Sequence, residues 1–314
     1  MTTRGHAPRS ADPDQNDARP DRPLADIEVR HLRTSEEFAA CVKLQHLTWG
    51  AGFSEQVPAA ILKVSQRIGG ITAGAFDAHG AMVGFVFGLT GIENHDLVHW
   101  SDMLAVRADR RDQGIGRLLK EFQLRALLEL GVTRIYWTFD PLVARNAHLN
   151  FNRLGVQVAE YVTNMYGDET DSVLHRGLGT DRFIVVRPIA GEDGGVAVHD
   201  RGSTQPLVAL AHDARVLNTV DANGIPTLPH LPTTPIEAMI RIAIPLEIEK
   251  VQATDLSLAA RWRDTTRRAI LWSMGHGYRV AGFYRDDATN YGFYVLSTSP
   301  QIQSPASHPA SQVL

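Results

Sequence analysis

Over the first 90 residues, the spacing of apolar residues is in some stretches that of a strand and in others that of a helix. Each change of spacing marks a boundary between predicted elements. Residues 27–32 alternate as a half-buried strand does. Apolar residues at helical spacing follow Thr34, which forms a capping box with Glu37, and a further helix begins near Pro58. The pattern therefore predicts, in order, a strand, two helices and a hairpin over residues 71–89.

The chain from Met103 to Leu119 passes from a short apolar run through a polar turn and a loop with two glycines into an amphipathic helix. Gly114 and Gly116 allow the backbone to approach a ligand closely. The N–H groups that open the following helix, together with its dipole, suit a pyrophosphate, and the flanking arginines add charge-assisted hydrogen bonds. The stretch therefore predicts a strand, a loop and a helix with an anion at the loop. A tight connection without a ligand is the alternative.

Shorter elements follow in the rest of the chain. They are, in order, a strand over 135–139, a helix over 144–154, extended structure over 156–162, short strands over 207–210 and 215–219, a strand over 240–245, a helix capped by Asp255 and a hairpin over 278–296. Residues 1–25 and 299–314 carry too few large apolar side chains to offset the entropy of ordering. We predict that both are disordered tails.

Composition and charge exclude several classes of protein. The chain has 314 residues and a formal net charge of −4, which gives no general attraction to nucleic acid or to anionic membranes. A single cysteine, Cys41, excludes an internal disulfide framework. No run approaches the roughly 20 apolar residues of a membrane span, and the N-terminus lacks the apolar core of a signal peptide. We expect a cytoplasmic protein of two domains, with neither nucleic acid nor membrane as a partner, and homo-oligomerisation is left open.

The run R-x-x-G-x-G after an L-x-V strand resembles the acyl-CoA-binding motif of the GNAT superfamily of acyltransferases. The succession after residue 139 resembles the second GNAT signature, N-x-x-A-x-x-x-Y-x-x-x-G, when it is aligned on Ala147 and Gly155. Two positions depart from that signature, since Phe151 stands at the tyrosine and Ala144 at the asparagine. The resemblance implies an α/β (α+β) GNAT fold, in which helices flank a central mixed sheet, with a smaller C-terminal α+β domain.

Composition and the element pattern divide the chain into segments, and the resemblance implies a set of contacts to acetyl-CoA or another acyl-CoA. The segments are a tail at 1–25, the GNAT domain at 26–189, a linker at 190–206, the C-terminal domain at 207–298 and a tail at 299–314. The implied contacts are Leu104, Ala105, Val106, Arg111, Asp112, Gln113, Gly114, Ile115, Gly116 and Arg117. Asn146 and Asn150 lie nearby and are further candidates, with a helix-surface amide or a local cap as the alternative.

Three further stretches, at 145–147, 177–182 and 261–270, resemble a subgroup of larger GNAT proteins with a C-terminal extension. Some of that subgroup are associated with N-acylation of amino acids, including succinylation, beside N-acylamino acid racemases. The resemblance implies transfer of an acetyl or succinyl group from CoA to the amine of a small molecule, with amino acids among the candidates. Direct attack in a ternary complex is expected, because no cysteine lies in the motif.

Such a transfer needs a base, because an α-amino group with a pKa of about 8 is mostly protonated at pH 7. Alternation along the predicted strand places His99, Ser101 and Met103 on one face and Asp102 on the other. The candidate catalytic residues are Asp102, His99 and, at the end of the next strand, Asp140. The alternatives are that His99 is a core histidine, that Asp102 holds a loop, and that Asp140 caps a helix.

Phe151 removes the tyrosine that serves as general acid in the family. Tyr161 and Tyr166 are spatial substitutes, and a thiolate leaving group with a pKa of about 8.5 needs an acid less than an alkoxide does. Trp49 and Phe53 are candidates for the acceptor pocket, with packing as the alternative.

No metal is expected, because His95 and His99 lie about 13 Å apart in an extended strand. The arginines at 261, 263, 267 and 268 are expected on a solvated helix face rather than in a binding patch. Two other function classes stay open. One is a GNAT-fold sensor or scaffold that binds acyl-CoA without transfer, which is favoured if the candidate bases point away from the thioester. The other is an α/β domain without CoA, which is favoured if the strand does not separate from its neighbour beside Val106.

Overall fold

The computed structural model describes residues 26–50, 52–167, 178–189 and 211–298. The two predicted tails, the linker at 190–206 and the strand at 207–210 lie outside the described residues. No helix in the described part of the chain is both long and apolar enough to cross a membrane.

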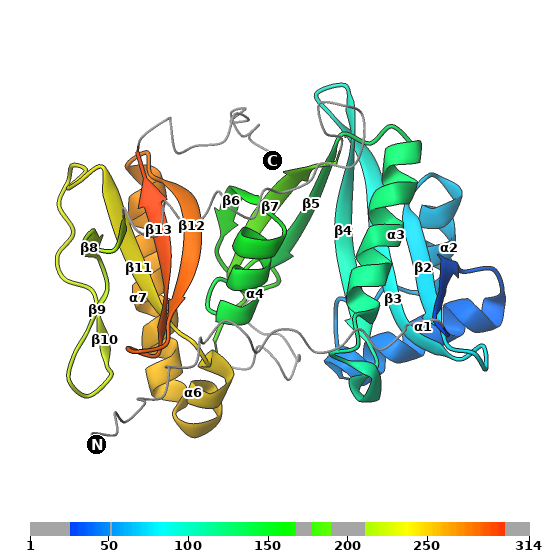
Figure 1. Ribbon diagram of the computed structural model, residues 1–314, viewed down its shortest axis with the longest axis horizontal. Helices are drawn as coiled ribbons and strands as arrows, with labels where there is room; N and C mark the ends of the chain where they lie inside the picture. The colour runs from blue at the N-terminus through cyan, green and yellow to red at the C-terminus, as the bar shows by residue number, and fades with distance from the viewer. Residues whose placement is uncertain (1–25, 51, 168–177, 190–210, 299–314) are drawn as a thin grey trace, which may run out of the picture.

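A seven-stranded mixed sheet forms the first part of the molecule (Figure 1). Its strand order is β1-β2-β3-β4-β5-β7-β6, and every neighbouring pair is antiparallel except β4 and β5, which are parallel. The bounds are β1 Glu28–His31, β2 Ile71–Phe76, β3 Met82–Glu93, β4 Asp96–Val106, β5 Arg134–Phe139, β6 Gln157–Val162 and β7 Arg182–Pro188. The predicted mixed sheet is therefore confirmed. The sequence pattern did not identify β7.

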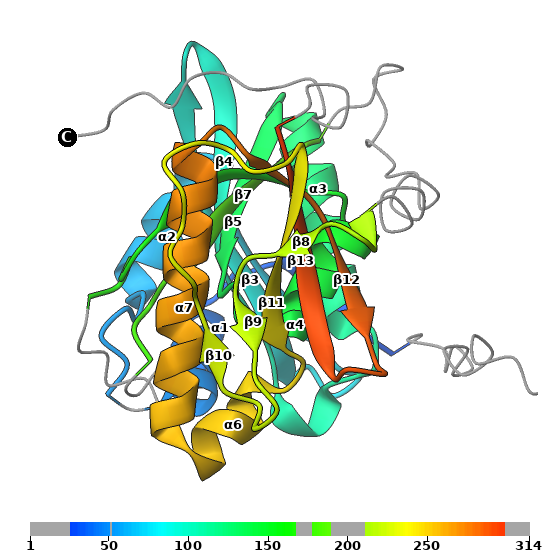
Figure 2. The same ribbon diagram turned by 90° about the vertical axis from the view of Figure 1, so that its left-hand side faces the viewer.

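Helices cover both faces of this sheet (Figure 2). One face carries α1, Ser35–Trp49, and α2, Ala59–Arg67, and the other carries α3, Ile115–Glu129, and α4, Ala144–His148. A 3-10 turn, Ala108–Arg110, precedes α3, and a π-helical turn, Leu149–Arg153, continues α4. The predicted capping box is confirmed, since Thr34 Oγ1 accepts from the Glu37 N–H and the Glu37 carboxylate accepts from the Thr34 N–H.

A second sheet follows towards the C-terminus, with the order β12-β13-β11-β8. The elements of this part are β8 Arg215–Val216, β9 Thr219–Val220, β10 Pro226–Thr227, β11 Met239–Pro245, α6 Ile248–Thr254, α7 Leu256–Gly275, β12 Arg279–Asp286 and β13 Tyr291–Ser297. The Asp255 side chain caps α7 by accepting from the Leu258 N–H, as predicted. The short helix α6 was not predicted.

The C-terminal sheet repeats the strand arrangement found at the end of the first sheet. In the first sheet, β5 is followed by helical turns and then by β6 and β7, and β7 lies between β5 and β6. In the second sheet, β11 is followed by helices and then by β12 and β13, and β13 lies between β11 and β12. The first strand also pairs in parallel with an earlier strand, β5 with β4 and β11 with β8. The same topology therefore occurs twice.

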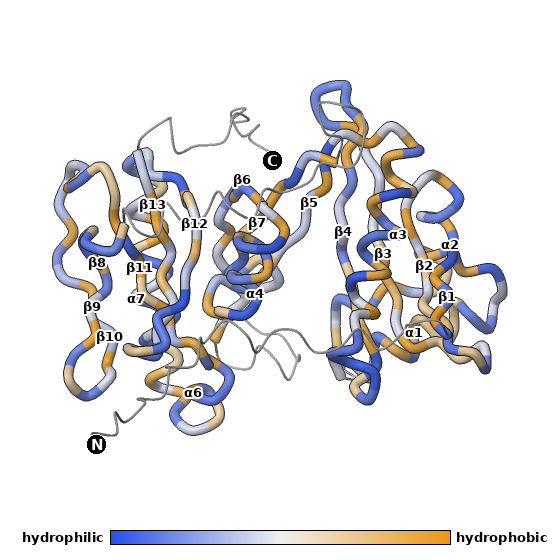
Figure 3. Tube along the Cα trace, viewed as in Figure 1, coloured by the Kyte–Doolittle hydropathy of each residue, from blue (hydrophilic) through white to orange (hydrophobic). Residues whose placement is uncertain are grey.

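The largest hydrophobic cluster crosses from the first sheet into the second. Phe139, Phe151 and Phe183 of the first part pack in one cluster with Trp262 and Tyr294 of the second. Figure 3 shows the hydrophobic residues concentrated along the strands of both parts. The two parts therefore share a core, while the predicted domain boundary lies outside the described residues.

Candidate active site

The parallel strands β4 and β5 separate into a fork. Their ladder ends at the pair Trp100–Tyr136, although β4 continues to Val106 and β5 to Phe139. Figure 1 shows the two strands moving apart towards the end where the loop before α3 lies. From Ser101 onward, the edge of β4 that faces β5 has no strand partner among the described residues. Backbone groups there are open to another donor or acceptor, which a ligand can supply.

A β-bulge at Asp102 changes the direction of the side chains along β4. The register opposite β3 skips Asp102, between Ser101 and Met103. Ser101 and His99 contact α3, whereas Met103 packs with α1 and α2 on the other face. The predicted common face of His99, Ser101 and Met103 is therefore wrong, because the extra residue shifts the alternation by one position.

Asp102 is the candidate base that remains accessible. Part of its side chain is exposed. Burial of the carboxyl group nonetheless raises the pKa of Asp102, and the negative charge of Glu55 adds to the rise, while a hydrogen bond with Trp100 opposes it. Glu55 lies in the loop between α1 and α2, the region expected to hold the acceptor. Two carboxylates therefore face the same side of the fork.

His99 lies in the core and both ring nitrogens have partners. Nδ1 lies 2.9 Å from Thr90 Oγ1, and Nε2 lies 3.1 Å from Gln123 Nε2. Burial, together with the positive charge of Lys120, lowers the pKa of His99 to about 3. This environment favours a satisfied core histidine over a base, and we do not retain His99 in the catalytic set.

Lys120 of α3 lies at the vertex of the fork. Its Nζ donates to Ser101 Oγ at 2.7 Å and to Gln123 Oε1 at 3.0 Å, and lies 5.2 Å from the centre of the Trp137 ring. Ser101 and Trp137 are the first residues of β4 and β5 beyond the ladder. Burial is the only cause that lowers the pKa of Lys120, to about 7, and no acidic side chain of the described residues pairs with it.

Lys120 is a candidate that sequence reasoning missed. Its spacing from Leu118 and Phe122 does not distinguish it from a surface lysine of an amphipathic helix. Its position depends on the ends of β4 and β5, which are distant in sequence.

The glycine loop has the predicted order of strand, loop and helix. Gly114 precedes α3 with φ of +82°, a left-handed conformation that suits glycine. The N-cap residue, Gly114, has no side chain that could cap the first N–H groups of α3. Arg111 and Arg117 are exposed, and Arg111 Nε donates to the Val106 carbonyl oxygen at 3.3 Å. The loop therefore presents N–H groups and guanidinium groups at the open end of the fork.

The strand residues predicted to contact CoA lie on the open arm of the fork. Leu104 and Val106 direct their side chains towards α3, and Ala105 packs with α1 and α2. A Cβ on Gly116 would lie 3.6 Å from Leu104 and 3.9 Å from Val106, which is ordinary contact. Neither its dihedral angles nor protein packing therefore requires glycine at position 116.

The structure separates the two asparagine candidates. Asn150 is buried, its Oδ1 accepts from Trp137 Nε1 at 2.7 Å, and its Nδ2 donates to the Asn146 carbonyl oxygen at 2.8 Å. This favours a local role for the Asn150 amide over a contact with CoA. Asn146 is partly exposed.

The two tyrosines considered as substitutes for the general acid differ in their exposure. Tyr161 is buried and donates to the Asp181 carboxylate. Tyr166 is partly exposed, with its hydroxyl 3.2 Å from Thr138 Oγ1 on β5. Phe151 lies in the aromatic core against Phe139. Tyr166 is therefore the accessible candidate acid.

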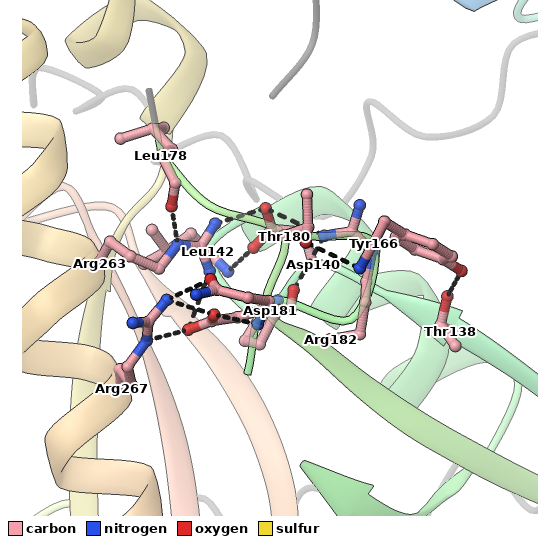
Figure 4. A network of polar contacts seen from close by, with 12 residues as sticks. Thr138, Asp140, Leu142, Tyr166, Leu178, Thr180, Asp181, Arg182, Arg263 and Arg267 are labelled. Atoms are coloured by element: carbon pink, nitrogen blue, oxygen red, sulfur yellow. Dashed lines mark hydrogen bonds and ion pairs between the residues drawn. The ribbon is translucent and has the colours of Figure 1, made fainter. Parts of the chain in front are cut away.

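Asp140 belongs to a buried ion network that ties α7 to the first sheet (Figure 4). Its Oδ2 accepts from Arg263 Nη2 at 2.6 Å, and its Oδ1 accepts from the Leu142 N–H at 2.8 Å. Asp181 binds Arg267 through two hydrogen bonds of 2.6 and 2.8 Å. These contacts favour a structural role for Asp140 over that of a base.

The predicted solvated face of α7 is wrong for two of its four arginines. Arg263 is buried and Arg267 is half-buried, whereas Arg261 and Arg268 are exposed. The reason is that Asp140 and Asp181, which lie on distant segments, bind the guanidinium groups of Arg263 and Arg267.

The aromatic candidates of the acceptor loop stack on each other. The rings of Trp49 and Phe53 lie 5.4 Å apart, and both pack at the edge of the cluster under α1. His95 lies in the turn between β3 and β4 with φ of +72°, rather than in the same strand as His99. Among the residues that the structure describes, no three His, Cys, Asp or Glu side chains gather as metal ligands.

Comparison with known proteins gives similarity in structure alone. No family model matches the chain, and no curated protein matches it. The chain is similar to a structure described as the NatC complex bound to Gag peptide and CoA, with 21% identity, a TM-score of 0.41, and coverage of 52% of this chain and 98% of that one. It is also similar to the ribosomal-protein-S18-alanine N-acetyltransferase of Escherichia coli, with 21% identity, a TM-score of 0.40, and coverage of 53% and 97%.

A third similar structure is a GNAT superfamily phosphinothricin acetyltransferase of Sinorhizobium meliloti in complex with AcCoA. Its identity is 14%, its TM-score is 0.41, and the match covers 56% of this chain and 97% of that one. All three similarities extend over about half of the chain.

Proposed function

We propose that this protein is an acyl-CoA-dependent N-acyltransferase that moves an acetyl or succinyl group to the amine of a small molecule, with amino acids as candidate acceptors. The observation that carries the proposal is the fork between β4 and β5, with an accessible carboxylate at a bulge on one arm. The unpaired edge of β4 offers backbone donors for a thioester oxygen. The N–H groups of the glycine loop, with Arg111 and Arg117, offer donors for a pyrophosphate.

Asp102 is the proposed base. Its raised pKa makes it a better proton acceptor near neutral pH than an ordinary aspartate. Together with Glu55 it provides two negative charges that attract an ammonium substrate. The ammonium group of the acceptor loses one proton to Asp102, and its nitrogen attacks the thioester carbonyl carbon. The carbon–sulfur bond breaks, CoA leaves as the thiolate, and the second proton lost by the nitrogen passes to that thiolate or to water.

Direct transfer suits the position of the cysteine. Cys41 is buried in α1, and burial raises the pKa of its thiol to about 12, so it does not serve as a nucleophile.

Lys120 supports succinyl over acetyl as the transferred group. An acyl chain that reaches the vertex of the fork meets an ammonium group that no carboxylate neutralises. A terminal carboxylate on the acyl group supplies the missing counter-charge, whereas a methyl group does not. The proposed donor is therefore an acyl-CoA with an anionic acyl end.

The test is a thiol-release assay with purified protein, acetyl-CoA or succinyl-CoA, and a panel of D- and L-amino acids. We expect CoA release that depends on one class of amine, is faster with succinyl-CoA, and falls in Asp102→Asn. The second candidate is a sensor of acyl-CoA without transfer. His99 and Asp140 are both engaged inside the protein, so this candidate gains if Asp102 does not act as the base. Tight acyl-CoA binding in calorimetry without release for any amine would decide for the sensor.

A further inference from the structure

A cavity of about 470 Å³ lies between the first turns of α1 and the later turns of α2. Its lining includes Arg33 and Ser35 at the start of α1, and Lys63 and Arg67 of α2. α1 has 15 residues and is about 22 Å long. The loop near Asp102 follows the far end of α1, so the cavity is separate from the fork.

The cavity is lined by three cations and no acid. Arg33 and Arg67 are exposed, and neither forms an ion pair with an acidic side chain in the described part of the chain. Lys63 Nζ donates to Ser35 Oγ at 3.2 Å and lies 5.3 Å from the centre of the Phe38 ring. The three positive charges therefore surround one recess in a chain whose net charge is −4.

Nearby carboxylates neutralise only part of this charge. Glu37 binds Arg30 through hydrogen bonds of 2.7 and 3.2 Å, and this pairing lowers the pKa of Glu37 to about 2. Glu36 is exposed on α1, where hydrogen bonds with its own backbone N–H and with Thr34 lower the pKa of its carboxyl group, and the charge of Lys63 lowers it further. Glu36 neutralises one of the three positive charges that line the cavity, so two positive charges remain without a counter-charge.

The floor of the cavity combines an acceptor with apolar surface. Gln66 Nε2 donates to the Leu32 carbonyl oxygen at 2.9 Å, which fixes the amide. Gln66 Oε1 is buried and receives no hydrogen bond within the described residues. A buried acceptor without a donor is destabilising, so a hydroxyl or amine of a ligand would relieve it. Leu32 and Phe38 supply apolar contact beside it.

We propose that this cavity binds a small phosphate monoester. The two uncompensated charges match a phosphate dianion, and guanidinium groups bind phosphate oxygens through pairs of hydrogen bonds. A hydroxyl of the same ligand donates to Gln66 Oε1. The volume lies within the range of about 300–1,000 Å³ that is usual for small-molecule sites.

The test uses calorimetry on the full chain with inorganic phosphate, AMP and adenosine as probes. The variant Arg33→Gln/Arg67→Gln removes both exposed arginines of the cavity. The matched control, Arg111→Gln/Arg117→Gln, removes the same charge from the glycine loop, where a phosphate also has a proposed site. All four side chains are exposed, so both variants should melt at the wild-type temperature without ligand.

We expect AMP and phosphate to bind the wild type and the control variant, and adenosine to bind neither. Arg33→Gln/Arg67→Gln should weaken AMP binding at the cavity by about tenfold or more, since hydrogen bonds to charged groups contribute about 1.5–3 kcal/mol each. Equal AMP affinity in this variant and the wild type would overturn the proposal. Loss of binding only in the control variant would assign the phosphate to the glycine loop instead. This result does not depend on the transferase activity.

Discussion

Replacement of Lys120 by methionine should stabilise the protein at neutral pH. The lysine holds an ammonium group at the vertex of the fork with two hydrogen bonds and no carboxylate. Methionine keeps the chain length and the contact with Trp137 but carries no charge. Ser101 Oγ and Gln123 Oε1 lie 3.1 Å apart and remain hydrogen-bonded to each other when the ammonium is removed. The substitution therefore removes a buried charge and leaves no polar group without a partner.

The size of the effect follows from the pKa. A fall from 10.5 to about 7 corresponds to a cost of about 4 kcal/mol at pH 7 for holding the charged form in the folded state. Loss of the two hydrogen bonds of the ammonium offsets about 1–2 kcal/mol. Lys120→Met should therefore raise the free energy of unfolding by about 2–3 kcal/mol at pH 7.

The sign of the pH dependence is fixed by the direction of the pKa change. Since the pKa is lowered in the folded state, the unfolded chain binds more protons between pH 7 and pH 10.5, and wild-type stability rises with pH across that window. The advantage of Lys120→Met is complete below pH 7 and is lost as the pH rises towards 10.5. The wild type gains about 3 kcal/mol relative to Lys120→Met between pH 7 and pH 9.5, so the two proteins should be about equally stable at pH 9.5.

Urea unfolding of the wild type and Lys120→Met at pH 7 and at pH 9.5 measures both quantities. An equal difference at the two pH values would refute the reasoning, because the lysine would then not be held in a low-pKa environment. A methionine variant that is less stable at pH 7 would refute it as well. A group that destabilises the fold is typical of a functional site.

Three further predictions concern the base, the ion network and the loop. Asp102→Asn should lower kcat by about 10²–10⁴-fold and raise the KM for the amine, because it removes one of the two charges that attract the ammonium substrate; an unchanged kcat in the thiol-release assay would exclude Asp102 as the base. Arg263→Met should cost about 3–5 kcal/mol in urea unfolding because it leaves a buried aspartate without its closest partner; the exposed Arg268→Met is the control and should cost under about 1 kcal/mol. Gly114→Ala should cost about 1–2 kcal/mol and weaken acyl-CoA binding, since alanine resists the left-handed φ, whereas Gly116→Ala should keep both stability and binding. Equal loss in the two glycine variants would contradict the geometry of the loop.

Local patterns were enough to predict most of the elements. The capping box of Thr34 and Glu37, the glycine before α3 and the Asp255 cap are each decided by residues within a few positions of one another. Such features are visible in one sequence because their hydrogen bonds close within a single turn of helix.

The parts of the site that were not predicted depend on contacts between distant segments. The bulge at Asp102 arises from pairing with β3, and it reversed the face expected for Met103. Arg263 is 123 residues from Asp140 in the chain, and neither residue type alone indicates that they form a buried pair. Lys120 likewise cannot be distinguished from a surface lysine until the positions of β4 and β5 beyond their ladder are known.

The repeated topology gives the molecule a second fork, which is closed by its own side chain. β8 and β11 pair in parallel at Arg215–Ile240 and Val216–Arg241, as β4 and β5 do before they separate. Asn218 then extends that pairing, since its Nδ2 donates to the Ala243 carbonyl oxygen at 2.8 Å and its Oδ1 accepts from the Ala243 N–H at 2.7 Å. An asparagine amide thus pairs with β11, the counterpart of β5, whereas the ligand proposed for the first copy pairs with β4.

The molecule therefore carries an internal standard for amide hydrogen exchange. The Ala243 N–H reports a fork whose backbone groups are already paired, whereas the amides of β4 beyond Ser101 that face the gap report one that is open. Slower exchange confined to β4 on addition of a ligand could be read against Ala243 in the same sample, without a second protein for comparison.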